Sequence, residues 1–212
     1  MAIRTITRTT HFYTDENGQE FELTFNAIEN TLSIKPIESG FEARYLVKDD
    51  DPIALSEMSD DADRGTIFLV HYHRDFCIEN KQYIEKDDLR RFYQGEKIDQ
   101  QKKFWIFPVA AYIHSGVALS LGNGQHFPDY SWDVSHVGAI LVNKKAEKSW
   151  RFNKKALQVA EYLLEEWNQY LAGDVYGIVK DTYDKDKKLI NNDAVWGFYG
   201  QQYALEALQT DI

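Results

Sequence analysis

The stretch that most constrains the fold is residues 105–142, WIFPVAAYIHSGVALSLGNGQHFPDYSWDVSHVGAILV. Two apolar runs, 104–121 and 136–142, are typical of largely buried strands, and they flank a loop from Gly122 to Asp133. The loop is rich in Gly, His, Trp and Asp. Because it joins two predicted strands, a rigid sheet would hold its polar side chains in position. We therefore expect this stretch to be either a functional site or a tightly packed centre.

Strand and helix patterns on both sides of this stretch predict an α+β fold. The Asn-Gly pair within Asp15–Gly18 favours positive φ, so residues 3–13 and 19–25 are expected to form a β-hairpin. Residues 153–172 predict the longest helix, with Asn153 as N-cap and Gly173 at its end. Further strands are predicted at 31–37, 41–47, 65–76, 175–182 and 189–197, and short helices at 84–94 and 203–209. The expected architecture is an antiparallel sheet packed by one long helix in the C-terminal half, with an N-terminal β meander.

An acidic segment, residues 49–63, divides the chain. It contains Pro52 and no basic residue, and like charges repel, so it is expected to be a loop or linker. The domains we predict are an N-terminal β extension over 1–48, the acidic linker over 49–63 and a main α+β domain over 64–212. The acidic residues of the linker are Asp49, Asp50, Asp51, Glu57, Asp60, Asp61 and Asp63.

Composition narrows the class of protein. The 212 residues are 43% apolar, which suffices for a folded core, and the net charge of -10 argues against a general nucleic-acid binder. The single Cys77 excludes an intramolecular disulfide and a CxxC zinc site. The N-terminus lacks the apolar region of a secretory signal, and no apolar run approaches the roughly 20 residues of a membrane span. We therefore expect a cytoplasmic protein without membrane insertion and without a cofactor.

Five blocks of residues stand in order along the chain. They are His73-Arg74, the run Tyr112–Ser120, Trp132-Asp133 with Val137-Gly138, the run Tyr170–Gly177 and the run Trp196–Gly200. Taken together, over about residues 65–203, they resemble an uncharacterised protein family encoded by bacteriophages and prophages. The chain departs from the family pattern in two blocks: Ile113 replaces an acidic residue, and Val134-Ser135 replaces Ser-Gly. The resemblance implies a mobile-element origin and a bacterial host cell, and it implies no established activity.

Histidine and aspartate residues in these blocks allow three interpretations. His71 and His73 lie two apart on a predicted strand, so both imidazoles point to one face. With His114 and Asp133 they would form a metal site of three nitrogens and one oxygen. Alternatively, His73, His114 and Asp133 would serve a small hydrolase or a nucleic-acid-modifying enzyme, with Arg74 binding an anion. The interpretation we favour is a structural network in which Asp133 fixes the His114 tautomer and Arg74 neutralises Asp133.

The acidic residues point to a different class of function, which is protein binding. Besides the 49–63 segment, Glu161 and Glu165 give the predicted long helix an acidic face. The resemblance to phage accessory proteins implies a host protein as partner. Our leading hypothesis is therefore an inhibitor that binds a bacterial defence complex, such as a CRISPR effector, and occludes its basic nucleic-acid channel. The enzyme described above is the alternative.

Overall fold

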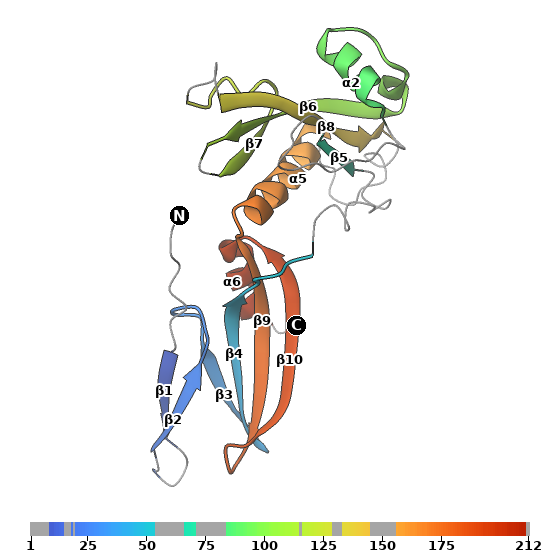
Figure 1. Cartoon of the computed structure of the whole chain (residues 1–212). Helices are drawn as coiled ribbons and strands as arrows, with labels where there is room; N and C mark the ends of the chain where they lie inside the picture. Colours follow the sequence, from blue (N-terminus) through green and yellow to red (C-terminus); the bar gives the residue numbers. More distant parts are fainter. Residues whose placement is uncertain are drawn as a thin grey trace. The chain divides into compact units, whose positions relative to one another are not determined.

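The computed structural model describes residues 9–14, 18, 20–53, 66–70, 84–114, 116–128, 133–144 and 156–210 (Figure 1). The strands are β1 (Thr9–Thr14), β2 (Glu20–Phe25), β3 (Ser33–Ile37), β4 (Gly40–Lys48), β5 (Thr66–Val70), β6 (Phe104–Ile113), β7 (Val117–Leu121), β8 (Val134–Asn143), β9 (Val175–Asp184) and β10 (Leu189–Tyr199). The helices are α2 (Lys86–Tyr93), the 3-10 helix η1 (Asp99–Lys102), α5 (Ala156–Leu171) and α6 (Gln201–Gln209). The described strands pair antiparallel, which confirms the α+β class with antiparallel sheets.

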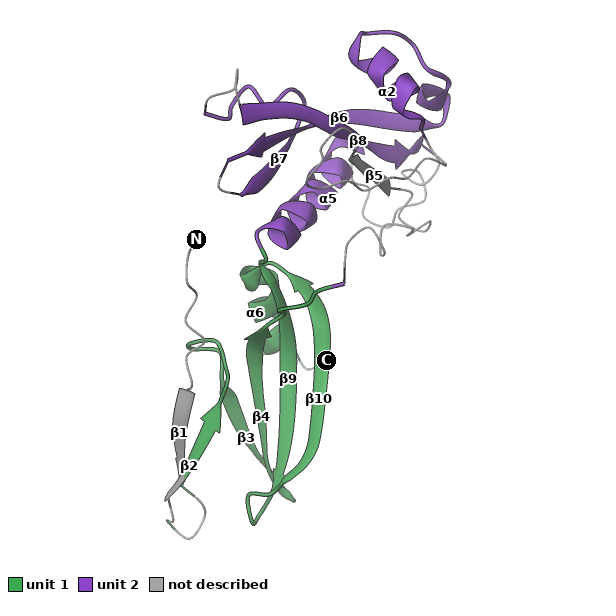
Figure 2. Ribbon diagram, in the orientation of Figure 1, with its two compact units in different colours: residues 1–52, 173–212 green, residues 53–172 purple. Residues whose placement is uncertain are grey.

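The chain forms two compact units, and the second is inserted into the first (Figure 2). Unit 1 comprises residues 1–52 and 173–212, and unit 2 comprises residues 53–172. The strands that flank the insertion, β4 and β9, are antiparallel neighbours, with Lys48 opposite Tyr176. Unit 2 therefore stands where a short hairpin turn would otherwise join these strands. This division differs from the predicted one, because β3 and β4 share a sheet with the C-terminal strands.

One apolar face of the main sheet in unit 1 packs against α6. The strand order of this sheet is β10-β9-β4-β3. Leu46 of β4 and Tyr176 and Ile178 of β9 form one buried cluster with Ala204 and Ala207 of α6. Because side chains alternate along a strand, the next residues of β4 and β9 point to the opposite face.

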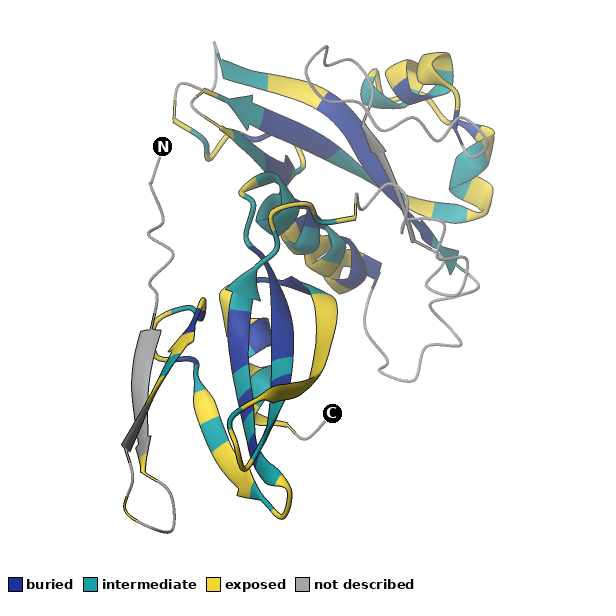
Figure 3. Ribbon diagram, turned by 60° about the horizontal axis from the view of Figure 1, so that its bottom comes forward, coloured by how far each residue is buried: buried dark blue, intermediate teal, exposed yellow. Residues whose placement is uncertain are grey.

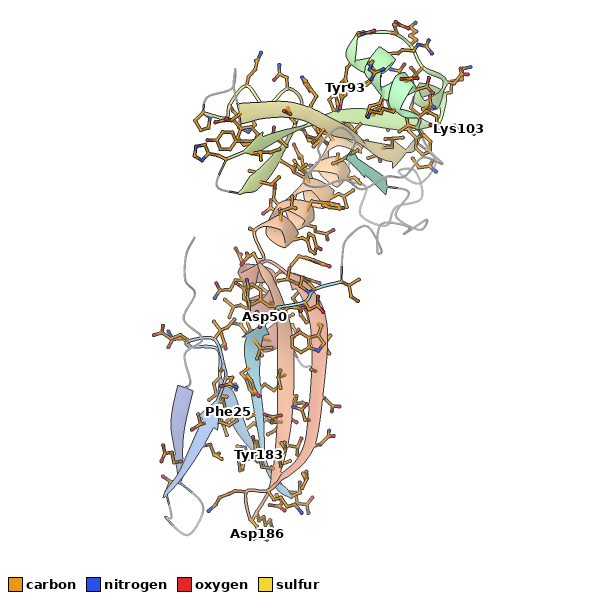
Figure 4. The ribbon with its side chains drawn as sticks, viewed as in Figure 1. Phe25, Asp50, Tyr93, Lys103, Tyr183 and Asp186 are labelled. Atoms are coloured by element: carbon orange, nitrogen blue, oxygen red, sulfur yellow. The ribbon has the colours of Figure 1, made fainter. Side chains whose placement is uncertain are left out.

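That opposite face packs against the end of the N-terminal hairpin. β1 and β2 pair as predicted, with Thr10 opposite Thr24. Phe25, the last residue of β2, is buried in a cluster with Tyr45 and Val179 of the main sheet. Phe25 also meets Tyr183 edge to face, with 6.3 Å between the ring centroids; both residues are labelled in Figure 4. The hairpin therefore contributes to the core of unit 1.

Contacts within unit 1 hold together the points where the chain leaves for unit 2 and returns. The Asp49 amide donates a hydrogen bond of 2.9 Å to the Val175 carbonyl. The Tyr176 hydroxyl donates to the Asp174 carboxylate at 2.7 Å, and the Lys48 ammonium lies 3.9 Å from the same oxygen. These contacts close the end of the sheet in the way that a turn would.

Unit 2 is built on a second sheet, with the strand order β5-β8-β6-β7 and with α2 and α5 on opposite sides (Figure 1). Leu89 of α2 is fully buried against Ala139 and Leu141 of β8. α5 contacts all four strands. Its Asn168 accepts from the Leu119 amide at 2.7 Å and donates to the Leu119 carbonyl at 3.0 Å, which ties the helix to the edge strand β7.

Most predicted elements are present with shifted ends, and the arrangement of the sheets differs from the prediction. The run 104–121 is a hairpin of β6 and β7 rather than one strand. The strands within the described ranges form two four-stranded sheets and one hairpin rather than a single sheet. The predicted N-cap Asn153 lies outside the described residues. In the described part of the chain, none of the helices has the length and apolar character needed to cross a membrane.

Candidate functional site

His114 and Asp133 lie at the same end of the sheet in unit 2. Tyr112 of β6 pairs with Val134 of β8, and His114 and Asp133 stand just beyond this pair. His114 is exposed and its ring stacks on Tyr112, with 6.3 Å between the centroids, whereas Asp133 is half-buried. No hydrogen bond or ion pair joins the two side chains in the described part of the chain. The contact by which Asp133 would fix the His114 tautomer is therefore not seen, and the network stays a hypothesis.

The remaining residues of the predicted histidine cluster, His71, His73 and Arg74, lie outside the described residues. Both the metal interpretation and the enzyme interpretation depend on them, so both stay hypotheses. Over the ranges that are described, no three His, Cys, Asp or Glu side chains come together in a group that could hold a metal ion.

Aromatic rings form a row at this end of unit 2. Tyr112 stacks on Phe127 at 5.4 Å between centroids, and the Phe127 ring lies 4.4 Å from the ring of His126. The row packs the loop after β7 against β6. Sequence reasoning did not find it, because Tyr112 and Phe127 belong to different elements and no local pattern links them.

The acidic segment is described only at its start. The Asp49 carboxylate accepts from the Asp51 amide at 3.2 Å, which turns the chain just after β4. Asp50 and Asp51 are exposed. The predicted partner-binding residues that lie outside the described ranges are Glu57, Asp60, Asp61 and Asp63.

One face of α5 combines carboxylates with large exposed side chains. Glu161 and Glu165 are exposed. Tyr162 is 57% exposed and Leu157 is 47% exposed. Helical spacing places Leu157, Glu161 and Glu165 in one row with Tyr162 beside it. We call these four residues the α5 outer face; the residues buried on the other side of the helix are Ala156, Val159, Ala160, Leu164 and Trp167. The sequence pattern indicated the two carboxylates and missed the apolar residues next to them.

A second exposed surface lies along β10, an edge strand of the main sheet in unit 1 (Figure 3). Among the described strands, only β9 pairs with β10. Four large apolar side chains of β10, each between 47% and 53% exposed, are Leu189, Ile190, Val195 and Trp196. The sequence predicted the strand but not this exposure, because apolar residues in adjacent pairs do not show which face is covered.

A hollow of about 120 Å³ opens beside β10 on the face that carries α6. Arg44, Lys180 and Asp193 line it and stand opposite one another on β4, β9 and β10. Lys180 lies 3.9 Å from the Glu42 carboxylate, and Arg44 donates to the Thr210 carbonyl at 3.2 Å. Of the two cationic side chains, Lys180 is on the strand beside the exposed edge and Arg44 is one strand further in.

On the other face, the buried carboxylate of Asp181 joins β4, β9 and β10. Asp181 is 5% exposed, and it accepts from the Tyr45 hydroxyl at 2.8 Å and from the Asn192 amide at 2.6 Å. Burial, the hydrogen bond to Asp181 and the charge of Asp181 raise the pKa of Tyr45 well above 10.0. Burial and the same carboxylate also raise the pKa of Tyr183, whose hydroxyl lies 3.5 Å from it. Both tyrosines therefore stay protonated and able to donate.

Comparisons of the chain with protein-family models, with curated proteins and with solved structures give no match. The resemblance to a phage-encoded family therefore stays a prediction from the five sequence blocks. The functional interpretation depends on the exposed surfaces described above.

Proposed function

We propose that this chain is a mobile-element accessory protein that binds and blocks a bacterial defence complex. The observation that carries the proposal is the α5 outer face, where the 57% exposed Tyr162 stands beside Glu161 and Glu165. A large aromatic side chain with polar neighbours is a frequent anchor of protein interfaces. The mobile-element origin is supported by the resemblance of the five sequence blocks.

The partner that fits the α5 outer face has a basic surface, such as the nucleic-acid channel of a CRISPR effector. Carboxylates on the α5 outer face and the net charge of -10 would attract such a surface and speed the encounter. Tyr162 and Leu157 would then bury apolar area in the contact and slow dissociation. Exposed Asp50 and Asp51, in unit 1, add negative charge. Inhibition would be steric, because the bound protein occupies the path of the nucleic acid.

A pull-down from a bacterial lysate that contains a CRISPR effector tests the proposal. The wild-type chain is expected to recover an effector subunit in stoichiometric amount. The double variant Glu161→Lys with Glu165→Lys reverses two charges, which at about 0.5–1 kcal/mol each predicts roughly a tenfold loss of affinity. Glu206→Lys is the matched control, since Glu206 is also an exposed glutamate on a helix but belongs to unit 1.

Tyr162→Ala separates the apolar anchor from the charge. It is expected to weaken recovery at every salt concentration, whereas the charge reversals act most strongly at low salt. Circular dichroism of each variant checks that the fold is kept. Recovery of no host protein, or equal recovery by the wild type and both α5 variants, would show that this face does not bind a defence complex.

A further inference from the structure

The two edges of the main sheet in unit 1 are built differently. The edge strand β3 has 5 residues and contains Lys35 and Pro36, which both discourage the addition of another strand. The edge strand β10 has 11 residues, no proline and no lysine, and Asp193 is its one charged residue. β3 is therefore protected against further pairing along its length. β10 has irregular register at Leu189–Asn191 and at Val195–Phe198, and between them the stretch Asn191–Val195 is regular and open to pairing.

Apolar side chains of β10 are exposed on both faces of the sheet. Val195 pairs with Ile178, which packs on the α6 side. Trp196, the next residue, lies over Gly177 of β9, so that a Cβ added to Gly177 would be 2.3 Å from the Trp196 ring. A partner that covered one face would leave the other face exposed. A strand added at the edge places alternate side chains beside both faces, so this mode of binding fits β10 best.

The hollow beside β10 indicates the chemistry of the added strand. Its lining contains two cationic side chains, Arg44 and Lys180, and one carboxylate, Asp193. The Asp193 carboxylate accepts from the Asn191 amide at 2.8 Å within its own strand. Glu42, on β4, lies 3.9 Å from Lys180 and offsets its charge, so the surroundings of the hollow tolerate one added carboxylate beside Val195 but do not require it. The expected occupant is an extended strand with apolar residues on both faces and few charges.

We propose that this occupant is β10 of a second copy of the chain, paired antiparallel about a two-fold axis. β10 itself has apolar residues on both faces and a single carboxylate. An axis at Ala194 sets Asp193 of each copy opposite Val195 of the other, so the two carboxylates do not oppose each other directly. Each Asp193 then lies on a strand about 4.8 Å, one strand spacing, from β10 of the other copy, and residues of that β10 line the other copy's hollow. The two main sheets join into one continuous sheet.

Sedimentation of the full chain tests this dimer. At about 50 μM we expect a species of twice the 24.7 kDa chain mass. Ala194→Lys sets two like charges against each other at the axis and is expected to raise the dissociation constant at least about tenfold. Ser33→Lys makes the same kind of change at an exposed residue of the β3 edge, and it is expected to leave the dimer unchanged.

A cysteine variant tests the same pairing without adding charge. Directly opposed residues of antiparallel strands bring their Cβ atoms about 4.5–5.5 Å apart, so oxidised Ala194→Cys is expected to give a covalent dimer on a non-reducing gel. Ser33→Cys is the control, since native Cys77 is present in both chains.

Three results would overturn the proposal: a monomer at this concentration, a dimer that Ala194→Lys leaves intact, or equal cross-linking of the two cysteine variants. A monomer that loses its host partner through Ala194→Lys would instead assign the edge to a strand of that partner. Because the variants that test the α5 outer face leave β10 unaltered, failure of the dimer and failure of the proposed function are separate results.

Discussion

Replacing Asp181 by alanine tests whether one buried carboxylate holds β4, β9 and β10 together. The change removes the acceptor of the Tyr45 hydroxyl at 2.8 Å and of the Asn192 amide at 2.6 Å. Hydrogen bonds to a charged group contribute about 1.5–3 kcal/mol each. Tyr45 is only 8% exposed, so its hydroxyl is left without an acceptor, whereas Asn192 is exposed and can bind water. We therefore expect a loss of about 2–4 kcal/mol from the stability of unit 1.

Hydrogen exchange followed by mass spectrometry resolves this loss by unit. Amides of β4 and β9 are expected to exchange roughly 30-fold to several hundredfold faster in Asp181→Ala, because 1.4 kcal/mol is about a factor of ten. Peptides from α5, which belongs to unit 2, are expected to keep their rates. Asp186→Ala, at an exposed carboxylate in the turn between β9 and β10, is the matched control and should change neither unit.

Two results would refute this reasoning. An increase of less than about threefold in the exchange of β4 and β9 would mean that the carboxylate contributes little net stability. Equal acceleration of unit 1 and α5 would mean that the two units do not open separately.

Three further predictions concern unit 1. Above pH 10.0 the folded state keeps the Tyr45 proton and the unfolded state loses it. The stability that this group contributes is therefore complete below that pH, and the free energy of unfolding falls by about 1.4 kcal/mol per pH unit above it. In urea unfolding, Tyr45→Phe should remove this contribution to the fall of the free energy of unfolding with pH. Gly177→Ala brings a Cβ to 2.3 Å from the Trp196 ring and should cost about 1–3 kcal/mol in thermal unfolding, with most of the loss absent in a Trp196→Ala background. Replacing residues 50–173 by an Asn-Gly turn should leave a folded unit 1 with dispersed amide signals in nuclear magnetic resonance, since β4 and β9 are already adjacent; an unfolded spectrum would contradict the independence of this unit.

Local sequence patterns predicted where the helices and strands of this protein lie better than they predicted which strands pair. The Asn-Gly turn at Gly18 predicted the β1–β2 hairpin, and the apolar stripe of 153–172 predicted α5. The pairing of β4 with β9 was not predicted, because all of unit 2 separates the two strands in the sequence. Local periodicity shows which face of a strand is apolar but contains no information on a distant partner.

The candidate surfaces were predicted in part, for a related reason. Exposure of Glu161 and Glu165 followed from their place opposite the apolar stripe, whereas Tyr162 and Leu157 would ordinarily be assigned to a core. Asp181 was missed because a single aspartate within a strand is usually solvent-exposed, and only the folded sheet brings the Tyr45 hydroxyl to it. The exposure of β10 depends on its position at the sheet edge, which is a property of the topology.

A plasmid interference assay tests the proposed inhibition most directly. Host cells with an active CRISPR effector receive a targeted plasmid while they express the wild-type chain, the Glu161→Lys and Glu165→Lys double variant, or Glu206→Lys. We predict that the wild type and Glu206→Lys restore transformation and that the double variant does not. No restoration by the wild type, or full restoration by the double variant, would contradict inhibition through the α5 outer face.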